Sequence, residues 1–368
     1  MQRCLDLARK GAGKVNPNPM VGCVIVRNGK IAGEGFHEKF GGPHAEIFAL
    51  ERAGNKTKGA TMYITLEPCV HFGKTPPCVD AIIHAGISKV VVASKDPNPL
   101  VNEKGIRRLR EAGIQVNVGV LQKEAELLNE KFFKFMKSGL PFVGIKLAQT
   151  LDGRIADVAG KSKWITSRIA QREVHHLRNN YDAVLVGATT VLQDNPELTV
   201  RHIKGFNPLR VVVDGHLSLP TSRAVFNTSA APTWLLTSVT AVREKKQKVK
   251  KLVSQGVRVL SVSTAYRFDA KSILRALAAE GVSSVLIEGG SYTVDRFVNR
   301  ALVDKVHLFF APKILGDGLN GFSFANPKLL HNPVKLIITK HSLVGEDVLI
   351  EAKFIHEKKR KKNVHRIG

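Results

Sequence analysis

Cysteine is scarce in this 368-residue chain, which contains only four, at positions 4, 23, 69 and 78. So few cysteines exclude the dense disulfide framework of a small secreted protein and favour free thiols in a reducing compartment. We therefore expect a cytoplasmic protein whose sulfur atoms are available for a metal ion or for catalysis.

Long apolar runs are also missing. Hydrophobic residues make up 43% of the chain, as in a typical globular protein, and no stretch approaches the roughly 20 apolar residues that a membrane-spanning helix needs. Near the N-terminus, Asp6, Arg9 and Lys10 interrupt any apolar segment that could serve as a secretory signal. We expect no membrane association.

Acidic residues are few beside basic ones: 31 against 56, which gives a net charge of +25. Such a field attracts anions from phosphorylated metabolites to nucleic acids. The alternative is a generally basic composition whose charges are spread over solvated faces. The densest basic run, Lys358–Lys362, lies near the C-terminus, and we expect residues 357–368 to form a disordered tail.

The length favours two domains. In the first part, expected strands at 21–26 and 30–36 flank Asn28-Gly29, a strong hairpin signal. Further strands are expected at 61–66, 89–94 and 114–120, and helices at 43–53, 77–85, 102–112 and 123–137. This alternation predicts an α/β domain with a mostly parallel sheet that is covered on both faces.

A break at Ser138–Pro141 places the expected domain boundary after residue 139. A second α/β series follows, with apolar strands at 142–148, 182–188, 209–214, 233–237, 257–262, 283–290 and 305–311. No fixed-period repeat relates the halves, so we expect two different folds. The second half lacks G-x-G-x-x-G, but Gly289-Gly290 joins a strand to a helix whose start could hold a phosphate.

Two cysteines stand in an unusual setting, because Cys69 and Cys78 each follow a proline directly. With His44 they supply one imidazole and two thiolates, a zinc ligand set that leaves the fourth position open, as in catalytic sites. A structural zinc with Cys23 as its fourth ligand is the alternative. Cys23 lies in the apolar stretch 21–26 and is more simply a core residue.

Glu46 lies two residues after His44 and can reach the open metal position. Zinc lowers the pKa of a bound water to about 7, and a carboxylate beside it can carry the proton to a leaving nitrogen. Alone, His-x-Glu is typical of a solvated helix start and Pro-Cys of a buried small residue. Together, in this order, they are typical of zinc nucleobase deaminases.

The spacing departs from the common deaminase P-C-x-x-C, because eight residues separate the two cysteines. With NPNPMVGCVIV (16–26), PHAE (43–46), LEPC (66–69) and DPNP (96–99), the chain resembles the bifunctional deaminase–reductases of riboflavin biosynthesis, from its first helix to about residue 350. The resemblance implies a cytidine-deaminase-like zinc domain over residues 1–139, with Glu46 as the catalytic residue and His44, Cys69 and Cys78 as ligands of one zinc ion.

The same resemblance implies that Asn18, His71 and Lys74 contact a phosphoribosylamino-pyrimidine substrate. For His71 and Lys74 the alternative is an exposed, solvated loop.

The second half resembles the reductase part of the family through KLAQTLDGRIA (146–156), SKWITS (162–167), GATTVLQDNPELTVR (187–201), IEGG (287–290) and APKILG (311–316). This implies a dihydrofolate-reductase-like domain over 140–356 that uses NADPH. The implied cofactor contacts are Ala148, Trp164, Thr190, Asp194, Gly215, Gly290, Ser291, Tyr292, Thr293, Val294, Asp295 and Arg296. The implied substrate contacts are Ser162, Arg178, Leu198, Arg201 and Glu288.

Several of these positions have a second interpretation. Arg178 and Arg201 could hold the substrate phosphate through forked hydrogen bonds, or be surface charges in a chain rich in them. Gly215 stands where many relatives have serine, so only a backbone contact is expected there. Asp152 could donate a proton to the imine or form an Asp-Gly turn, and the acid of the reductase step stays unassigned.

The sequence therefore predicts an enzyme that deaminates 2,5-diamino-6-(5-phosphoribosylamino)pyrimidin-4-one by zinc-hydroxide attack and then reduces the ribose of the product with NADPH. We expect a small-molecule substrate, no nucleic-acid partner and a homodimer formed through the reductase domain. Two alternatives remain: a tRNA-type nucleic-acid deaminase with an accessory domain, for which the charge would be the phosphate footprint, and a zinc-stabilised interaction module without activity.

Overall fold

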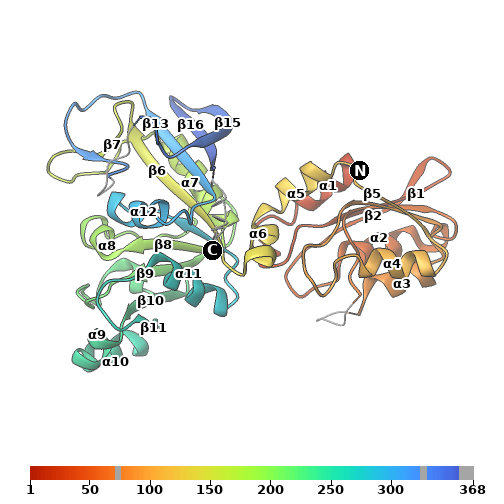
Figure 1. Ribbon diagram of the computed structural model, residues 1–368, viewed down its shortest axis with the longest axis horizontal. Helices are drawn as coiled ribbons and strands as arrows, with labels where there is room; N and C mark the ends of the chain where they lie inside the picture. Colours follow the sequence, from red (N-terminus) through yellow and green to blue (C-terminus); the bar gives the residue numbers. More distant parts are fainter. Residues whose placement is uncertain (71–75, 324–329, 356–368) are drawn as a thin grey trace, which may run out of the picture.

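The computed structural model describes residues 1–70, 76–323 and 330–355, and Figure 1 shows two lobes, each built around one main sheet. The first lobe holds a five-stranded sheet of order β2-β1-β3-β4-β5, and the second a nine-stranded sheet of order β11-β10-β9-β8-β12-β6-β13-β16-β15. A short ribbon pairs β14 with β7. The predicted α/β fold class is confirmed.

The first lobe contains α1 (Gln2–Arg9), β1 (Gly22–Arg27), β2 (Lys30–Phe36), α2 (Ala45–Ala53), β3 (Thr61–Leu66), α3 (Cys78–His84), β4 (Lys89–Ser94), α4 (Lys104–Glu111), β5 (Gln115–Val118), α5 (Gln122–Leu128) and α6 (Glu130–Ser138). The second contains β6 (Phe142–Thr150), β7 (Arg154–Ala156), α7 (Arg168–Asn180), β8 (Ala183–Gly187), α8 (Ala188–Asp194), β9 (Leu209–Val213), β10 (Thr233–Ser238), α9 (Val239–Glu244), α10 (Lys246–Ser254), β11 (Arg258–Ser263), α11 (Ala270–Ala279), β12 (Ser284–Ile287), α12 (Ser291–Val298), β13 (Lys305–Ala311), β14 (Leu319–Asn320), β15 (Leu336–Val344) and β16 (Asp347–Phe354).

The first sheet is mixed, which corrects the prediction of a mostly parallel one. Strand β1 runs antiparallel to both β2 and β3, whereas β3–β4 and β4–β5 are parallel. The hairpin accounts for the β1–β2 pair: Asn28 and Gly29 adopt positive φ angles of 51° and 72°, and this tight turn returns β2 beside β1.

Helices cover both faces of the first sheet. The apolar residues of α2, α3 and α4 form one core with the inward-facing residues of the strands. Helices α1 and α5 pack on the other face through Leu5, Leu7 and Ala125. Helix α2 lies very close to β2, since a Cβ atom at Gly35 would come within 2.2 Å of the Ala45 carbonyl oxygen. Glycine at this position therefore fixes how near the helix that begins after His44 can lie to the sheet.

In the second lobe, α7, α9 and α10 pack on one face of the sheet, and α11 and α12 on the other. The edge strand β15 is largely exposed, with Ile337 and Ile338 at 57% and 61% of their surface. Strands β15 and β16 lie beyond the range in which the sequence predicted strands.

The segment expected as one helix, 123–137, is two helices separated at Asn129. The side-chain amide of Asn129 accepts a hydrogen bond from Met20 N at 2.8 Å and donates one to Met20 O at 2.9 Å. This contact joins residues more than 100 positions apart, so a local pattern could not reveal it. After α6, Gly139 takes a left-handed conformation with φ 65°, and β6 begins at Phe142.

No helix in the described part of the chain is long and apolar enough to cross a bilayer. The basic tail expected at 357–368 lies outside the described residues.

Candidate active sites

The three predicted zinc ligands meet at one point in the first lobe. The donor atoms of His44, Cys69 and Cys78 all lie within 4.8 Å of one another. His44 Nδ1 is 3.1 Å from Cys78 Sγ and 3.6 Å from Cys69 Sγ. A tetrahedral zinc with Zn–N near 2.0–2.1 Å and Zn–S near 2.3 Å would separate nitrogen and sulfur by about 3.6 Å. The donor set therefore fits this ion.

Two of the three ligands lie at helix starts. His44 directly precedes α2, and Cys78 is the first residue of α3. The backbone N–H of Cys78 donates to Cys69 Sγ at 3.4 Å, so a free N–H group at the start of α3 helps to hold the sulfur of Cys69. Cys23 is fully buried in the core of the first sheet, and within the described ranges it is not part of the ligand cluster.

The two sulfur ligands differ in their electrostatic surroundings. Hydrogen bonds from Cys78 and His44 lower the pKa of the Cys69 thiol, although burial opposes this. Cys69 therefore readily carries a thiolate, the form that ligates metals. The hydrogen bond with Cys69 and the burial of Cys78 itself raise the pKa of the Cys78 thiol.

Glu46 lies in the same cavity as His44 and Cys69, a space of about 270 Å³. Its side chain is only 3% exposed, and burial raises the pKa of its carboxyl group to about 6, although the charge of His44 opposes the rise. A buried carboxylate beside a metal site, with a pKa near neutrality, can both take up and release a proton. This is the property that the sequence analysis expected of Glu46.

Asn18, the predicted ring contact, also lines this cavity. Its amide nitrogen lies 3.2 Å from His37 Nε2, while His37 Nδ1 donates to the Pro43 carbonyl oxygen at 3.0 Å. Burial lowers the pKa of His37, which favours the neutral ring that this pattern needs. His37 therefore orients the Asn18 amide, and no sequence signal had identified it.

Two acidic residues, Glu67 and Asp96, lie in motifs that the sequence analysis used, but neither residue was given a role of its own there. The carboxylate of Glu67, in LEPC, accepts backbone N–H groups from Asp96, Glu103, Gly105 and Ile106, and so fixes the loop that leads into α4. Asp96, in DPNP, lines the cavity, and burial raises the pKa of its carboxyl group to about 6. The predicted contacts His71 and Lys74 lie outside the described residues.

The second lobe has a larger cavity of about 790 Å³ across the carboxyl ends of β6, β8, β9 and β12. This is the edge at which open α/β sheets usually bind ligands. Most of the predicted reductase residues line it: Ala148, Ser162, Arg178, Thr190, Asp194, Leu198, Gly215, Glu288, Gly290, Ser291, Tyr292, Thr293 and Arg296. Most residues that the sequence predicted for the reductase site therefore lie around one cavity.

Four predicted residues do not line this cavity. Trp164 is 66% exposed, and Val294 is fully buried in the core. Asp295 accepts the backbone N–H of Ser323 at 3.1 Å. Arg201 is exposed and bonds to Glu197 and Thr199.

A buried ion pair forms part of the cavity lining. Arg178 donates two hydrogen bonds to the Glu288 carboxylate, at 2.7 and 2.8 Å, and a third to the Thr199 carbonyl oxygen. Burial opposes ionisation, but the charge of Arg178 outweighs it and lowers the pKa of Glu288. The guanidinium group of Arg178 thus already binds Glu288 and Thr199 within the protein.

Lys146 lines the same cavity and was not predicted. Burial lowers the pKa of its ammonium group, although the charge of Glu288 opposes this. The signal was present in the sequence, since Lys146 is the one charged residue within the apolar run 142–148.

The far end of the cavity lies beyond β9. Here the His216 ring stacks on Tyr266 with centroids 4.2 Å apart, and both line the cavity together with Arg267. A Cβ atom at Gly215 would come within 2.0 Å of the Tyr266 carbonyl oxygen. Glycine at this position therefore allows the two loops to approach closely.

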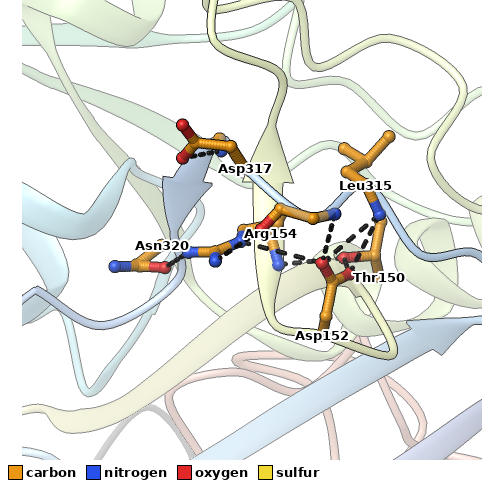
Figure 2. A network of polar contacts seen from close by, with 8 residues as sticks. Thr150, Asp152, Arg154, Leu315, Asp317 and Asn320 are labelled. Atoms are coloured by element: carbon orange, nitrogen blue, oxygen red, sulfur yellow. Dashed lines mark hydrogen bonds and ion pairs between the residues drawn. The ribbon is translucent and has the colours of Figure 1, made fainter.

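Figure 2 shows the network that braces the ribbon at another wall of this cavity. The Asp152 carboxylate accepts a hydrogen bond from Thr150 Oγ1 and from the backbone N–H groups of Leu315 and Gly316. Arg154 then bonds to Asn320 and to the Gly316 carbonyl oxygen. Asp152 thus ties its own turn to the segment after β13, which agrees with the turn interpretation.

Comparison with known proteins matches both lobes. The family described as the cytidine and deoxycytidylate deaminase zinc-binding region matches residues 1–94, and the RibD C-terminal domain family matches residues 141–350. The riboflavin biosynthesis protein RibD of Aquifex aeolicus is 45% identical over 351 residues, which cover 95% of this chain and 96% of the relative. The Escherichia coli protein of the same name is 40% identical over 335 residues, covering 87% and 89%.

Solved structures of proteins with the same two domains are also similar to this chain over almost its whole length. The diaminohydroxyphosphoribosylaminopyrimidine deaminase/5-amino-6-(5-phosphoribosylamino)uracil reductase of Thermotoga maritima is 42% identical, with a TM-score of 0.86 over 96% of this chain and 97% of its own. RibD of Acinetobacter baumannii is 35% identical, with a TM-score of 0.88 over 96% and 98%.

Proposed function

Because the chain belongs to the RibD family of bifunctional deaminase–reductases of riboflavin biosynthesis, we propose which of its residues carry each of the two reactions. The family assignment confirms the predicted function and leaves the nucleic-acid deaminase and the inactive module without support. The boundary after residue 139, between the deaminase and reductase domains, remains part of the proposal.

In the deaminase domain, His44, Cys69 and Cys78 hold the zinc ion, which when bound activates water for attack on the ring carbon that carries the amino group. Glu46 carries protons between that water and the departing nitrogen. Asn18, oriented by His37, binds the pyrimidine edge, and Asp96 faces the same space. The observation that carries this assignment is the meeting of three soft ligands and one buried carboxylate in a single cavity.

In the reductase domain, we assign the substrate to the end of the cavity that is lined by Ser162, Leu198 and the Arg178–Glu288 pair. Since Arg178 is committed to Glu288, Arg201 is the better candidate for the substrate phosphate. It lies on the segment that contains Leu198, although outside the cavity lining, it is exposed, and among the described residues its side chain bonds only to Glu197 and Thr199. Lys146, half-buried and close enough to Glu288 to feel its charge, can donate a hydrogen bond to the pyrimidine.

NADPH is assigned to the rest of the cavity, where it would supply the hydride. The run from Gly290 to Thr293 presents the start of α12 to the cavity, and the free N–H groups there suit the diphosphate. Arg267 is exposed at the far end and has no side-chain hydrogen bond or ion pair within the described ranges. It is therefore available for the 2′-phosphate.

The acidic residue at this end of the cavity is already hydrogen-bonded within the protein. Asp214, at the end of β9, could bind a ribose diol as in NAD-dependent proteins. Its carboxylate instead accepts the Ser218 hydroxyl and the backbone N–H of Leu219. This commitment favours NADPH over NADH.

The exposed strand β15 supports the predicted homodimer. Ile337, Ile338 and Leu343 are apolar side chains on an edge strand, and Leu343 is 77% exposed. An edge of this kind invites pairing with a second copy of the chain. Light scattering coupled to gel filtration would test it, with Ile338→Lys expected to shift the mass toward a monomer.

The cytoplasmic location stays a prediction, supported by the four free cysteines. The experiment that tests the proposal incubates the purified protein with the diaminopyrimidine phosphoriboside, with and without NADPH, and follows ammonia release and NADPH oxidation separately. We expect ammonia in both samples and oxidation only after deamination. Oxidation without ammonia, or ammonia release unaffected by zinc removal, would contradict the assignment.

A further inference from the structure

Helix α6 carries two different faces. Glu130, Lys131 and Lys134 lie on one side, and Phe132, Phe133 and Met136 on the other. At about 100° per residue, the mean directions of these two sets are roughly 200° apart. In Figure 1, α6 lies between the two lobes. The helix can therefore contact both domains at once.

The apolar face forms part of the deaminase site. Phe132 and Met136 line the cavity that holds the metal ligands and Glu46. Phe132 and Phe133 pack with Leu66, the last residue of β3, three positions before Cys69.

The residue before the helix reinforces this role. Asn129 binds both the N–H and the carbonyl oxygen of Met20, and Asn18 and Pro19 just before it line the cavity. A movement of α6 would thus shift both a wall of the cavity and the segment that presents Asn18.

The charged face is held by the reductase sheet. The Glu130 carboxylate lies 3.4 Å from Lys305 Nζ on β13 and 2.8 Å from Lys353 Nζ on β16. Lys134 Nζ lies 2.9 Å from Asp304, immediately before β13. Lys131 donates to the Asn180 carbonyl oxygen and lies 3.8 Å from the centre of the Tyr181 ring.

The Glu130–Lys305 pair is shielded from water and continues into the sheet, whereas the Lys353 side chain is 39% exposed. The side chains of Glu130 and Lys305 are 17% and 15% exposed. Lys305 also pairs with Glu351 at 2.9 Å, which fixes the ammonium group from the other side. Ion pairs of low exposure are less screened than surface pairs, and removing one partner leaves a charge without compensation.

We propose that Glu130 is a positioning residue for deamination. By binding Lys305 and Lys353 it fixes α6 against the reductase sheet. Helix α6 in turn fixes Phe132 and the segment that carries Asn18, both of which line the deaminase cavity. The reductase domain thereby completes the substrate pocket of the other domain. This inference rests on the proposed deaminase site. It requires substrate binding to depend on Glu130 while zinc stays bound, because His44 and Cys78 lie at the starts of α2 and α3 and Cys69 lies in the segment after β3, so none of the three ligands is on α6.

The test is Glu130→Gln in the full-length zinc-loaded protein. We expect the KM for ammonia release to rise about tenfold, because small displacements of a binding surface have effects of this order or larger. The zinc content and the reductase KM for NADPH should stay as in the unaltered protein. Hydrogen exchange at the Met20 amide should quicken, since that N–H is protected by Asn129. Glu124→Gln on α5 is the matched control, because Glu124 is exposed.

A double-mutant cycle separates positioning from general weakening. If Glu130 acts through its lysine partners, Lys353→Met should raise the same KM, and the double variant should show less than the product of the two effects. Multiplying effects, or an unchanged KM in Glu130→Gln, would overturn the inference while leaving the proposed function intact. If the unaltered protein bound no zinc and released no ammonia, the proposed function itself would fail.

Discussion

The two cavities of the molecule differ in how their chemistry is built. The deaminase cavity is small, about 270 Å³, and its three candidate zinc ligands lie close together, two at helix starts and Cys69 in the segment between β3 and α3. The reductase cavity is about 790 Å³ and is lined by the ends of several strands and the loops that follow them. Metal chemistry needs particular side chains at particular distances, whereas cofactor binding relies largely on shape and on backbone groups.

The difference also appears in the charges. In the deaminase cavity, Glu46 and Asp96 are buried carboxyl groups whose pKa values burial raises to about 6. In the reductase cavity, the Arg178 and Glu288 charges are already paired with each other. We therefore expect substitutions of residues that line one cavity to affect one reaction and leave the other unchanged. The predictions below test that separation, from the largest expected effect to the smallest.

The largest effect is expected for Cys78→Ala. Removal of this ligand leaves only two strong donors, so bound zinc should fall well below that of the unaltered protein, and ammonia release should be lost. Metal analysis by mass spectrometry measures this directly. Cys23→Ala, a change at a buried cysteine outside the cluster, is the control and should keep its zinc. Full metal content in Cys78→Ala would mean that the ligand set is wrong.

Glu46→Gln should slow deamination by roughly 10²- to 10⁴-fold, the usual contribution of a positioned proton carrier. Zinc content should be unchanged, because the amide keeps the shape of the side chain and Glu46 is not a ligand. Reduction of a pre-deaminated substrate should proceed at the normal rate. Normal ammonia release in this variant would remove the proton-transfer role.

Arg201→Ala should raise the reductase KM for the phosphorylated substrate by about tenfold, the order expected for a lost charge-assisted hydrogen bond. The KM for NADPH and the deaminase rate should change little. Steady-state kinetics on the deaminated intermediate measures both constants. An unchanged substrate KM would exclude Arg201 as the phosphate contact.

Arg267→Ala should reduce the preference for NADPH over NADH by about fivefold, since an exposed charge contributes no more than about 1 kcal/mol. Equilibrium titration of nucleotide fluorescence gives the two dissociation constants without turnover. Arg243→Ala, at a basic residue of α9 that does not line the cavity, serves as the control. Equal losses for both nucleotides would place the 2′-phosphate elsewhere.

The smallest effect concerns pH. The neighbouring His307 and the ammonium group of Lys305 lower the pKa of Glu351 from 4.5 to about 2. A lowered folded-state pKa stabilises the protein above the unfolded value, and this contribution is lost as the pH falls from about 4.5 toward 2. Because Glu351 is only partly buried and water screens its partners, Glu351→Gln should flatten the acid dependence of urea unfolding in that window by less than about 1 kcal/mol. An identical acid dependence in both proteins would contradict the network at β13 and β16.

The sequence predicted the local features of this molecule well. Strand β3 and strand β4 begin and end at the predicted residues, because their apolar β-branched runs are bounded by clear turn signals. The metal ligands were identifiable because a zinc site requires a characteristic set of residue types. The Asn28-Gly29 hairpin was equally clear, yet the mixed sheet that it produces was not predicted.

Non-local contacts account for the misses. The break at Asn129 depends on a hydrogen bond to Met20 in a distant segment. The ion pair of Arg178 with Glu288 joins α7 to the end of β12, and no pattern in either segment predicts it. His37 orients Asn18 only once the chain has folded. Residues that act by holding other residues thus leave little trace in a single sequence.

The most direct test of the account is X-ray absorption at the zinc edge of the purified, full-length protein. The account predicts a single zinc ion bound by one nitrogen and two sulfur atoms, with a light atom from solvent in the fourth position. A spectrum with four protein ligands, or folded protein without zinc, would contradict it.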